Sequence, residues 1–197
     1  MEHPLALRLI PTMLTREEWL NTALDKMRPW FEEAGDPLPE KIRTSIGWMG
    51  GRGRKSSTIG QCWHPDQVSD KTPAVFIVPT LDDPIRILDV LVHEGVHAAG
   101  KFNHRKEFSD LAKKLGLVKP WTATTASPEL KEKLVALAAE LGPFDHAAIK
   151  KDALKRQTTR LLKVVCPNEG YIARITKKWI DDMGFPTCPC GEEMLYG

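Results

Sequence analysis

Hydrophobic residues recur at helical spacing in four stretches of the chain, and capping residues mark where these stretches begin. Thr15 and Glu18 form a capping box before the first stretch. Asp83 and Pro84 place an acidic N-cap and a first-turn proline before the second. The expected helices run over about residues 16–34, from Pro84 to Ala99, from an Asn103 cap to Gly116, and from Ser127 to Gly142.

Short β-branched or alternating runs predict strands between the first two helices and again near the C-terminus. Residues 42–48 and 58–63 flank a glycine-rich turn and are expected to pair as a hairpin. The run 74–78 is continuously apolar and lies between two prolines, which indicates a buried strand. Two further pieces, 161–165 and 171–175, lie among cysteines and predict a compact C-terminal module. Helices followed by separate small sheets indicate an α+β fold.

Two histidines lie four residues apart on the second expected helix, in the motif His93-Glu94-Gly95-Val96-His97. Residues at this spacing share one helix face, about 5–6 Å apart at Cβ, so both imidazoles can bind one Zn²⁺. Glu94 lies about a quarter-turn away and can take a proton from a water at the metal as that water attacks a carbonyl. The alternative is a helix with two satisfied histidines and a surface glutamate, which would place polar groups beside the apolar stripe without compensation.

A catalytic zinc site needs a third protein ligand and one open position. His104 is the favoured candidate, because imidazole is already the local ligand type and Gly100 lets the chain turn back toward the metal. It follows His97 by seven residues, one more than in the metzincin pattern. A carboxylate from a later helix, Glu107 or Glu129, is the alternative third ligand.

The run from Phe76 to Pro79 and the run from Ile87 to Ala98, followed by His104 and Phe108, resemble the SprT-like metallopeptidases, the family that includes Spartan. In that family the third zinc ligand is a histidine after the HExxH helix, with an aromatic residue four positions later. A glycine typically follows that histidine, where this chain has Arg105. The resemblance covers about residues 40–197. It implies a zincin-type protease domain, with helices packed on a short sheet that contains antiparallel strands, and a C-terminal zinc-ribbon-like module, often acting on proteins bound or crosslinked to DNA.

Three cysteines lie in the C-terminal module: Cys166, Cys188 and Cys190. A zinc ribbon usually has two CxxC pairs, and here Glu169 stands where the first pair would have its second cysteine. The three thiols are therefore a candidate second, structural zinc site. Its fourth ligand would be Glu169 or a distant histidine, His146 or His64. The alternative is a ribbon without metal, held by a small apolar core.

Composition narrows the class of protein. With 42% hydrophobic and 27% charged residues and a net charge of +2, the chain has the make-up of a globular protein rather than a disordered, collagenous or coiled-coil one. No run approaches the ~20 apolar residues of a membrane span. Four cysteines without an export signal predict a cytoplasmic protein whose thiols bind metal more readily than they form disulfides.

Positive charge is concentrated late in the chain. Residues 146–180 contain nine Lys or Arg against two acidic residues. Localised charge of this size favours contact with a nucleic acid over an ordinary solvated surface. The candidate contacts are Lys150, Lys151, Lys155, Arg156, Arg160, Arg174, Lys177 and Lys178.

Together these features predict four segments: a flanking helix in 1–40, a SprT-like metallopeptidase domain in 41–145, a basic linker in 146–157 and a zinc-ribbon-like module in 158–197. The expected function is zinc-dependent hydrolysis of peptide bonds by water that Glu94 activates at the metal.

The expected ligands of the catalytic zinc are His93, His97 and His104. His146 and Arg105 are candidates for stabilising the oxyanion. Expected partners are protein substrates and DNA, with no membrane. Two alternatives stay open: a nucleic-acid-binding regulatory protein with a structural or vestigial metal site, and a hydrolase of small amides.

Overall fold

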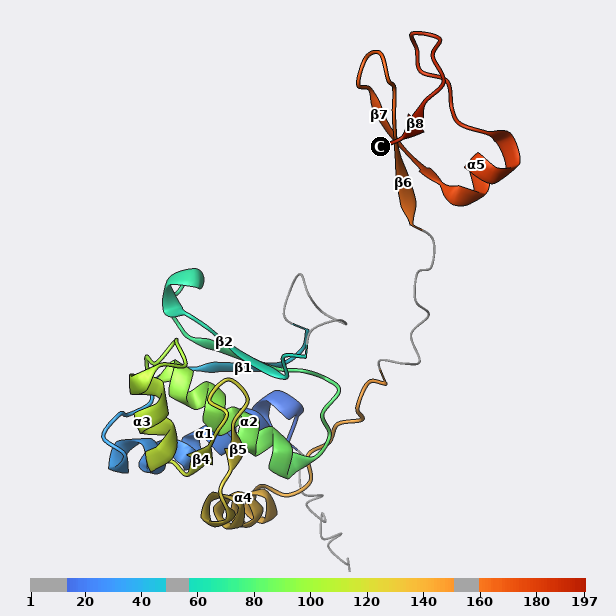
Figure 1. Cartoon of the computed structure of the whole chain (residues 1–197). Coiled ribbons are helices and arrows are strands. Elements are labelled where there is room, and N and C mark those ends of the chain that lie inside the picture. Colours follow the sequence, from blue (N-terminus) through green and yellow to red (C-terminus); the bar gives the residue numbers. More distant parts are fainter. Residues whose placement is uncertain (1–13, 49–56, 151–159) are drawn as a thin grey trace, which may run out of the picture. The chain divides into compact units, whose positions relative to one another are not determined.

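A computed structural model describes residues 14–48, 57–150 and 160–197 (Figure 1). The chain divides into two compact units, Met1–Lys151 and Asp152–Gly197. Both units combine helix with small sheets, which confirms the α+β class. No helix in the described ranges is long and apolar enough to cross a membrane.

The described residues of the first unit include four α-helices: α1 (Arg16–Glu33), α2 (Pro84–Ala98), α3 (Lys106–Lys114) and α4 (Pro128–Leu141). The expected caps of α1, α2 and α4 are confirmed, because the side chains of Thr15, Asp83 and Ser127 each accept a backbone hydrogen bond from the first turn. Helix α3 begins later than expected. The Asn103 side chain accepts a bond from the Arg105 amide at 3.1 Å and so forms a turn before the helix instead of capping it.

Strands β1 (Arg43–Ile46), β2 (Gly60–Trp63) and β3 (Ala74–Ile77) form a sheet in the order β1-β3-β2. The predicted hairpin of the first two strands is wrong, because both pair with β3 instead, β1 in parallel and β2 antiparallel. The apolar strand β3 takes the central position, where its side chains are most covered, and leaves the more polar strands at the edges. A short 3₁₀ turn, η2 (Pro65–Gln67), follows β2.

Helix α1 packs in the same core as α2 and the sheet, although the sequence set residues 1–40 apart as a flanking segment. Trp19, Met27 and Phe31 of α1 are fully buried. At Gly95 in α2, an added Cβ would lie 2.7 Å from Cζ of Phe31, so the two helices approach closely beside the two motif histidines. A small hairpin of β4 (Leu117–Val118) and β5 (Thr125–Ala126) connects α3 to α4.

The second unit contains β6 (Leu161–Val165), β7 (Ile172–Thr176), α5 (Lys177–Met183) and β8 (Leu195–Tyr196). Its three strands pair antiparallel in the order β7-β6-β8. The buried cluster of its described part is small and includes two of the cysteines: Val164, Cys166, Ile180, Cys188 and Met194.

Candidate metal centre

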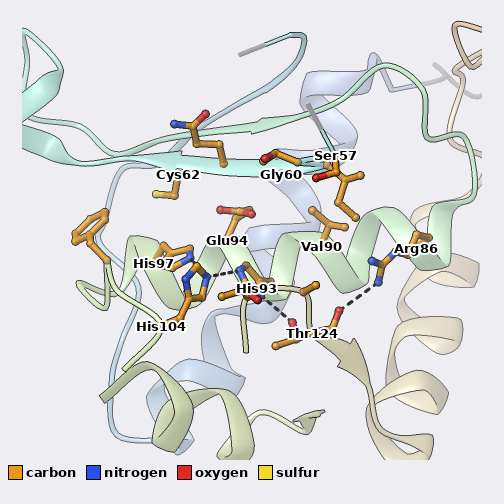
Figure 2. A pocket seen from close by; sticks show the side chains of 16 residues that line it. Ser57, Gly60, Cys62, Arg86, Val90, His93, Glu94, His97, His104 and Thr124 are labelled. Carbon is orange, nitrogen blue, oxygen red and sulfur yellow. Dashed lines mark hydrogen bonds between the residues drawn. The ribbon is translucent and has the colours of Figure 1, made fainter. Parts of the chain in front are cut away.

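Three histidine side chains converge at one point in the first unit (Figure 2). Helix α2 supplies His93 and His97 from one face, and the segment between α2 and α3 supplies His104. The Nε2 atom of His104 lies 3.2 Å from Nε2 of His97 and 3.3 Å from Nε2 of His93. The sequence prediction of these three residues as one group is therefore matched by their placement.

The spacing of these nitrogens fits a tetrahedral metal ion. Ligands at Zn–N distances of 2.0–2.1 Å and tetrahedral angles lie about 3.3–3.4 Å from one another. Hydrogen bonds alone do not account for the cluster, because a neutral imidazole carries a single N–H and Nε2 of His104 can donate to only one neighbour. A cation shared by three lone pairs satisfies all three rings.

In both α2 histidines the second ring nitrogen, Nδ1, has a hydrogen-bond partner in the protein. Nδ1 of His97 lies 2.7 Å from the carbonyl oxygen of Lys101, which can only accept, so Nδ1 carries the proton and Nε2 keeps its lone pair. Nδ1 of His93 lies 2.8 Å from Oγ1 of Thr124. Burial, with smaller contributions from the neighbouring histidines, lowers the pKa of His93 to about 3 and that of His97 to about 4. Both rings are therefore neutral near pH 7, as metal ligands must be.

Phe108 forms the floor of the cluster. Helix α3 places its fully buried ring 4.9 Å from the centroid of His93 and 4.8 Å from those of His97 and His104. One rigid aromatic side chain thus touches all three imidazoles and limits how they can rotate.

Glu94 is almost completely buried beside the histidines, and its Oε2 atom has no hydrogen-bond partner in the described part of the chain. Burial raises the pKa of this carboxyl to about 8, although the backbone amide of Cys62 opposes the shift. Figure 2 shows the carboxylate directed at strand β2, between Gly60 and Cys62. A Cβ at Gly60 would lie 2.5 Å from Oε1 of Glu94 and 2.5 Å from Cγ1 of Val90, so only glycine leaves room here.

The cluster opens into a pocket of about 750 Å³. Residues 57–62, which include the first part of β2, form one wall of the pocket, and residues 122–124 form the other. Helix α2 forms its base. The pocket combines apolar surface from Ile59, Val90 and Phe102 with the polar cluster, as ligand sites generally do.

Other sequence candidates do not line this pocket. The alternative ligands Glu107 and Glu129 are exposed elsewhere, and Arg105 is exposed at the start of α3. Nε2 of His146 donates to the carbonyl of Pro79 at 3.0 Å, away from the histidine cluster. The structure thus brings neither oxyanion candidate to the site.

Among the pocket residues that the sequence did not single out are Arg86 and Thr124, which a hydrogen bond joins. Arg86 lies two helical turns before His93 on α2, so helical spacing was a signal that could have found it. Thr124 comes from a distant loop and carries no such signal.

In the second unit, the sulfur atoms of Cys166, Cys188 and Cys190 lie within 4.8 Å of one another. Sγ of Cys166 and Cys190 are 3.5 Å apart, close to the roughly 3.8 Å that thiolates on one tetrahedral zinc would show at 2.3 Å per bond. The amide of Glu169 donates to Sγ of Cys166 at 3.4 Å and lowers the pKa of that thiol.

No fourth metal-binding side chain belongs to this cysteine group in the described ranges. The Glu169 carboxylate is outside it, and His64 caps η2 in the first unit by accepting from the Asp66 amide. His146 is likewise held in the first unit by the Pro79 carbonyl.

Among the basic candidates, Lys150, Arg160, Arg174, Lys177 and Lys178 are exposed, and Lys151, Lys155 and Arg156 lie outside the described residues. Arg174 on β7 stands directly opposite Lys163 on β6, another exposed cation that was not singled out. Like charges at paired positions destabilise a sheet unless an anion offsets them.

Comparisons with protein-family models, with curated proteins and with solved structures give no match to this chain. The resemblance to SprT-like metallopeptidases therefore stays a prediction.

Proposed function

We propose that the first unit is a zinc-dependent peptidase, with His93, His97 and His104 as zinc ligands and Glu94 as general acid and base. The observation that carries this proposal is the convergence of three Nε2 atoms, 3.2 and 3.3 Å apart, beside a buried carboxylate in an open pocket. Zinc bound there would lower the pKa of water and polarise a substrate carbonyl.

Glu94 is the residue that handles the proton. A cation held by the three histidines would oppose the effect of burial on the pKa of Glu94 and favour its ionised form. The carboxylate, whose Oε2 has no partner in the described chain, could then accept a proton from the attacking water and pass it to the leaving amine. The close passage of β2 at Gly60 limits the directions in which the carboxylate can turn. Positioning of this kind supplies much of the rate in hydrolytic enzymes.

A peptide is favoured over a small amide because β2 is an edge strand. It pairs with β3 on one side only among the described strands, and its residues form one wall of the pocket. An edge strand offers unpaired N–H and C=O groups to an extended chain, so a substrate peptide can add to the sheet and place its carbonyl over the histidine cluster.

A role for the second unit in binding DNA completes the proposal. It is supported by the exposed Arg174 and Lys163, which are paired across β6 and β7 and have no acidic partner in the described chain. If phosphates are the ligands, affinity for single-stranded DNA should fall steeply with added salt. Affinity that does not change with salt would argue against this mode.

The test uses purified full chain with two substitutions at the motif. Glu94→Gln should retain stoichiometric zinc by elemental analysis and lose cleavage of casein, measured with and without single-stranded DNA. His93→Ala should lose the zinc of the first unit and keep only what the three cysteines hold. Glu107→Gln is the matched control, because this glutamate is exposed on α3 and should leave both zinc and cleavage unchanged.

Full cleavage by Glu94→Gln would overturn the peptidase proposal. DNA binding that survives chelation, in a chain that cleaves nothing under any condition, would favour a nucleic-acid-binding regulatory protein with a structural metal site instead.

A further inference from the structure

Thr124 lies far from the HExxH motif in the sequence but contacts two residues of helix α2, His93 and Arg86. This buried residue directly precedes β5 and forms part of the pocket wall opposite β2. Its Oγ1 lies 2.8 Å from Nδ1 of His93, and its carbonyl oxygen accepts from Nη1 of Arg86 at 3.5 Å (Figure 2). Both the side chain and the backbone of Thr124 are thus tied to helix α2.

The Arg86 end of this connection is itself anchored. Nη1 of Arg86 forms an ion pair with the carboxylate of Asp89, whose side chain is only 8% exposed. Arg86, Asp89 and His93 are spaced by three and four residues, so they lie on one face of α2. Arg86 on this face thus contacts the backbone of Thr124 without any metal, and the Thr124 hydroxyl lies against Nδ1 of His93 on the same face.

We propose that Thr124 is a positioning residue for the metal site, an inference that rests on the zinc-binding role proposed above. In the tautomer that binds metal through Nε2, its hydroxyl accepts the Nδ1 proton of His93. Because the neutral ring has a single N–H, this bond leaves the lone pair on Nε2, directed at the other two histidines. The Lys101 carbonyl does the same for His97. Each α2 histidine therefore has, before metal arrives, a partner at Nδ1 that can accept its proton in the tautomer that binds metal.

Thr124→Val tests this directly, because valine keeps the shape of the side chain and removes the hydroxyl. Loss of such a partner typically weakens metal binding by roughly 10–100-fold. We expect a decrease of that size in zinc affinity, measured by competition with a chromophoric chelator on the full chain. A His93→Ala chain reports the zinc bound elsewhere, which is subtracted.

Two further variants separate the hydroxyl from general structure. Thr124→Ser should restore zinc affinity, and Thr125→Val, at the exposed neighbouring position, should leave it unchanged. Thr124→Val should lower the thermal midpoint of the metal-free chain modestly, because Nδ1 of His93 loses its partner, and Thr124→Ser should restore the midpoint. If the valine variant does not fold, Thr124→Ser and Thr124→Ala are compared, since serine alone retains a hydroxyl.

Wild-type affinity in Thr124→Val, or equal affinity in the serine and alanine variants, overturns the positioning role and leaves the peptidase proposal intact. A wild-type chain that holds no more zinc than His93→Ala overturns both. Weaker binding that serine restores is the result that supports the inference.

Discussion

Gly60 shows how far the geometry of the site depends on a residue with no functional group. A side-chain carbon added at this position on β2 would lie 2.5 Å from both Oε1 of Glu94 and Cγ1 of Val90. Gly60→Ala must therefore displace the carboxylate or the strand. A misplacement of about 1 Å can cost up to roughly 100-fold in rate, so we expect cleavage to fall by a factor of that order while zinc content is unchanged.

Gly47→Ala is the matched control for this substitution. Gly47 follows the other edge strand, and a Cβ there would have its nearest neighbour, an atom of Phe76, at 4.0 Å. This variant should cleave casein at the wild-type rate. Equal rates for the two alanine variants would show that close packing of β2 on Glu94 does not matter for the reaction.

The residues of the site differ in how readily a sequence reveals them. His93, Glu94 and His97 are visible because helical geometry alone sets their relation. The proposed third ligand is visible because His104 lies a few residues beyond the end of that helix. Thr124 is not visible, because its contact with His93 spans 31 residues and depends on where the β4–β5 hairpin places the chain.

At the scale of elements, the packing of α1 on α2 sets a limit on the motif itself. Gly95 lies between the two motif histidines, and Cζ of Phe31 occupies the space where its side chain would be. Alanine is favoured over glycine inside a helix by roughly 1 kcal/mol. Overpacking a core costs about 1–3 kcal/mol, so the clash should prevail. Gly95→Ala should therefore lower the thermal midpoint of the first unit.

A second substitution identifies the cause. If the clash with Phe31 is responsible, Phe31→Leu should be less harmful in the Gly95→Ala background than alone, a coupling that a double-mutant cycle measures from thermal midpoints. Additive effects of the two substitutions would contradict the packing argument. Either result bears on whether α1 belongs to the same folding unit as the histidine cluster.

Elements were predicted best where their signals are local. Thr15, Asp83 and Ser127 cap the helices that the sequence assigned to them, because a cap depends mainly on neighbouring residues. The Asn103 cap failed although its signal was local too, since its side chain bonds the Arg105 amide in a turn before α3. The pairing of β1 and β2 failed because a glycine-rich turn suggests a hairpin but does not determine which strand lies between its arms. The apolar β3 does so, through burial that the turn cannot report.

For the molecule as a whole, the two units differ greatly in what stabilises them. In the described chain, 25 hydrophobic residues form the buried cluster of the first unit, against five in the second. Two of those five are Cys166 and Cys188, which belong to the thiol group. A core this small rarely stabilises a fold by itself, and natural domains of this size often add a metal.

Chelation should therefore affect the units differently. If the three thiols hold a metal, removing it should unfold the second unit and leave the first folded, and Cys188→Ser should do the same without chelator. Trp179 is the one tryptophan in 152–197, so its indole resonance reports on the second unit alone. His93→Ala provides the contrast, because losing the first metal should leave that resonance in place. A native Trp179 signal in metal-free Cys188→Ser would mean that the apolar cluster suffices, and that the three sulfurs lie together without any ion to hold them.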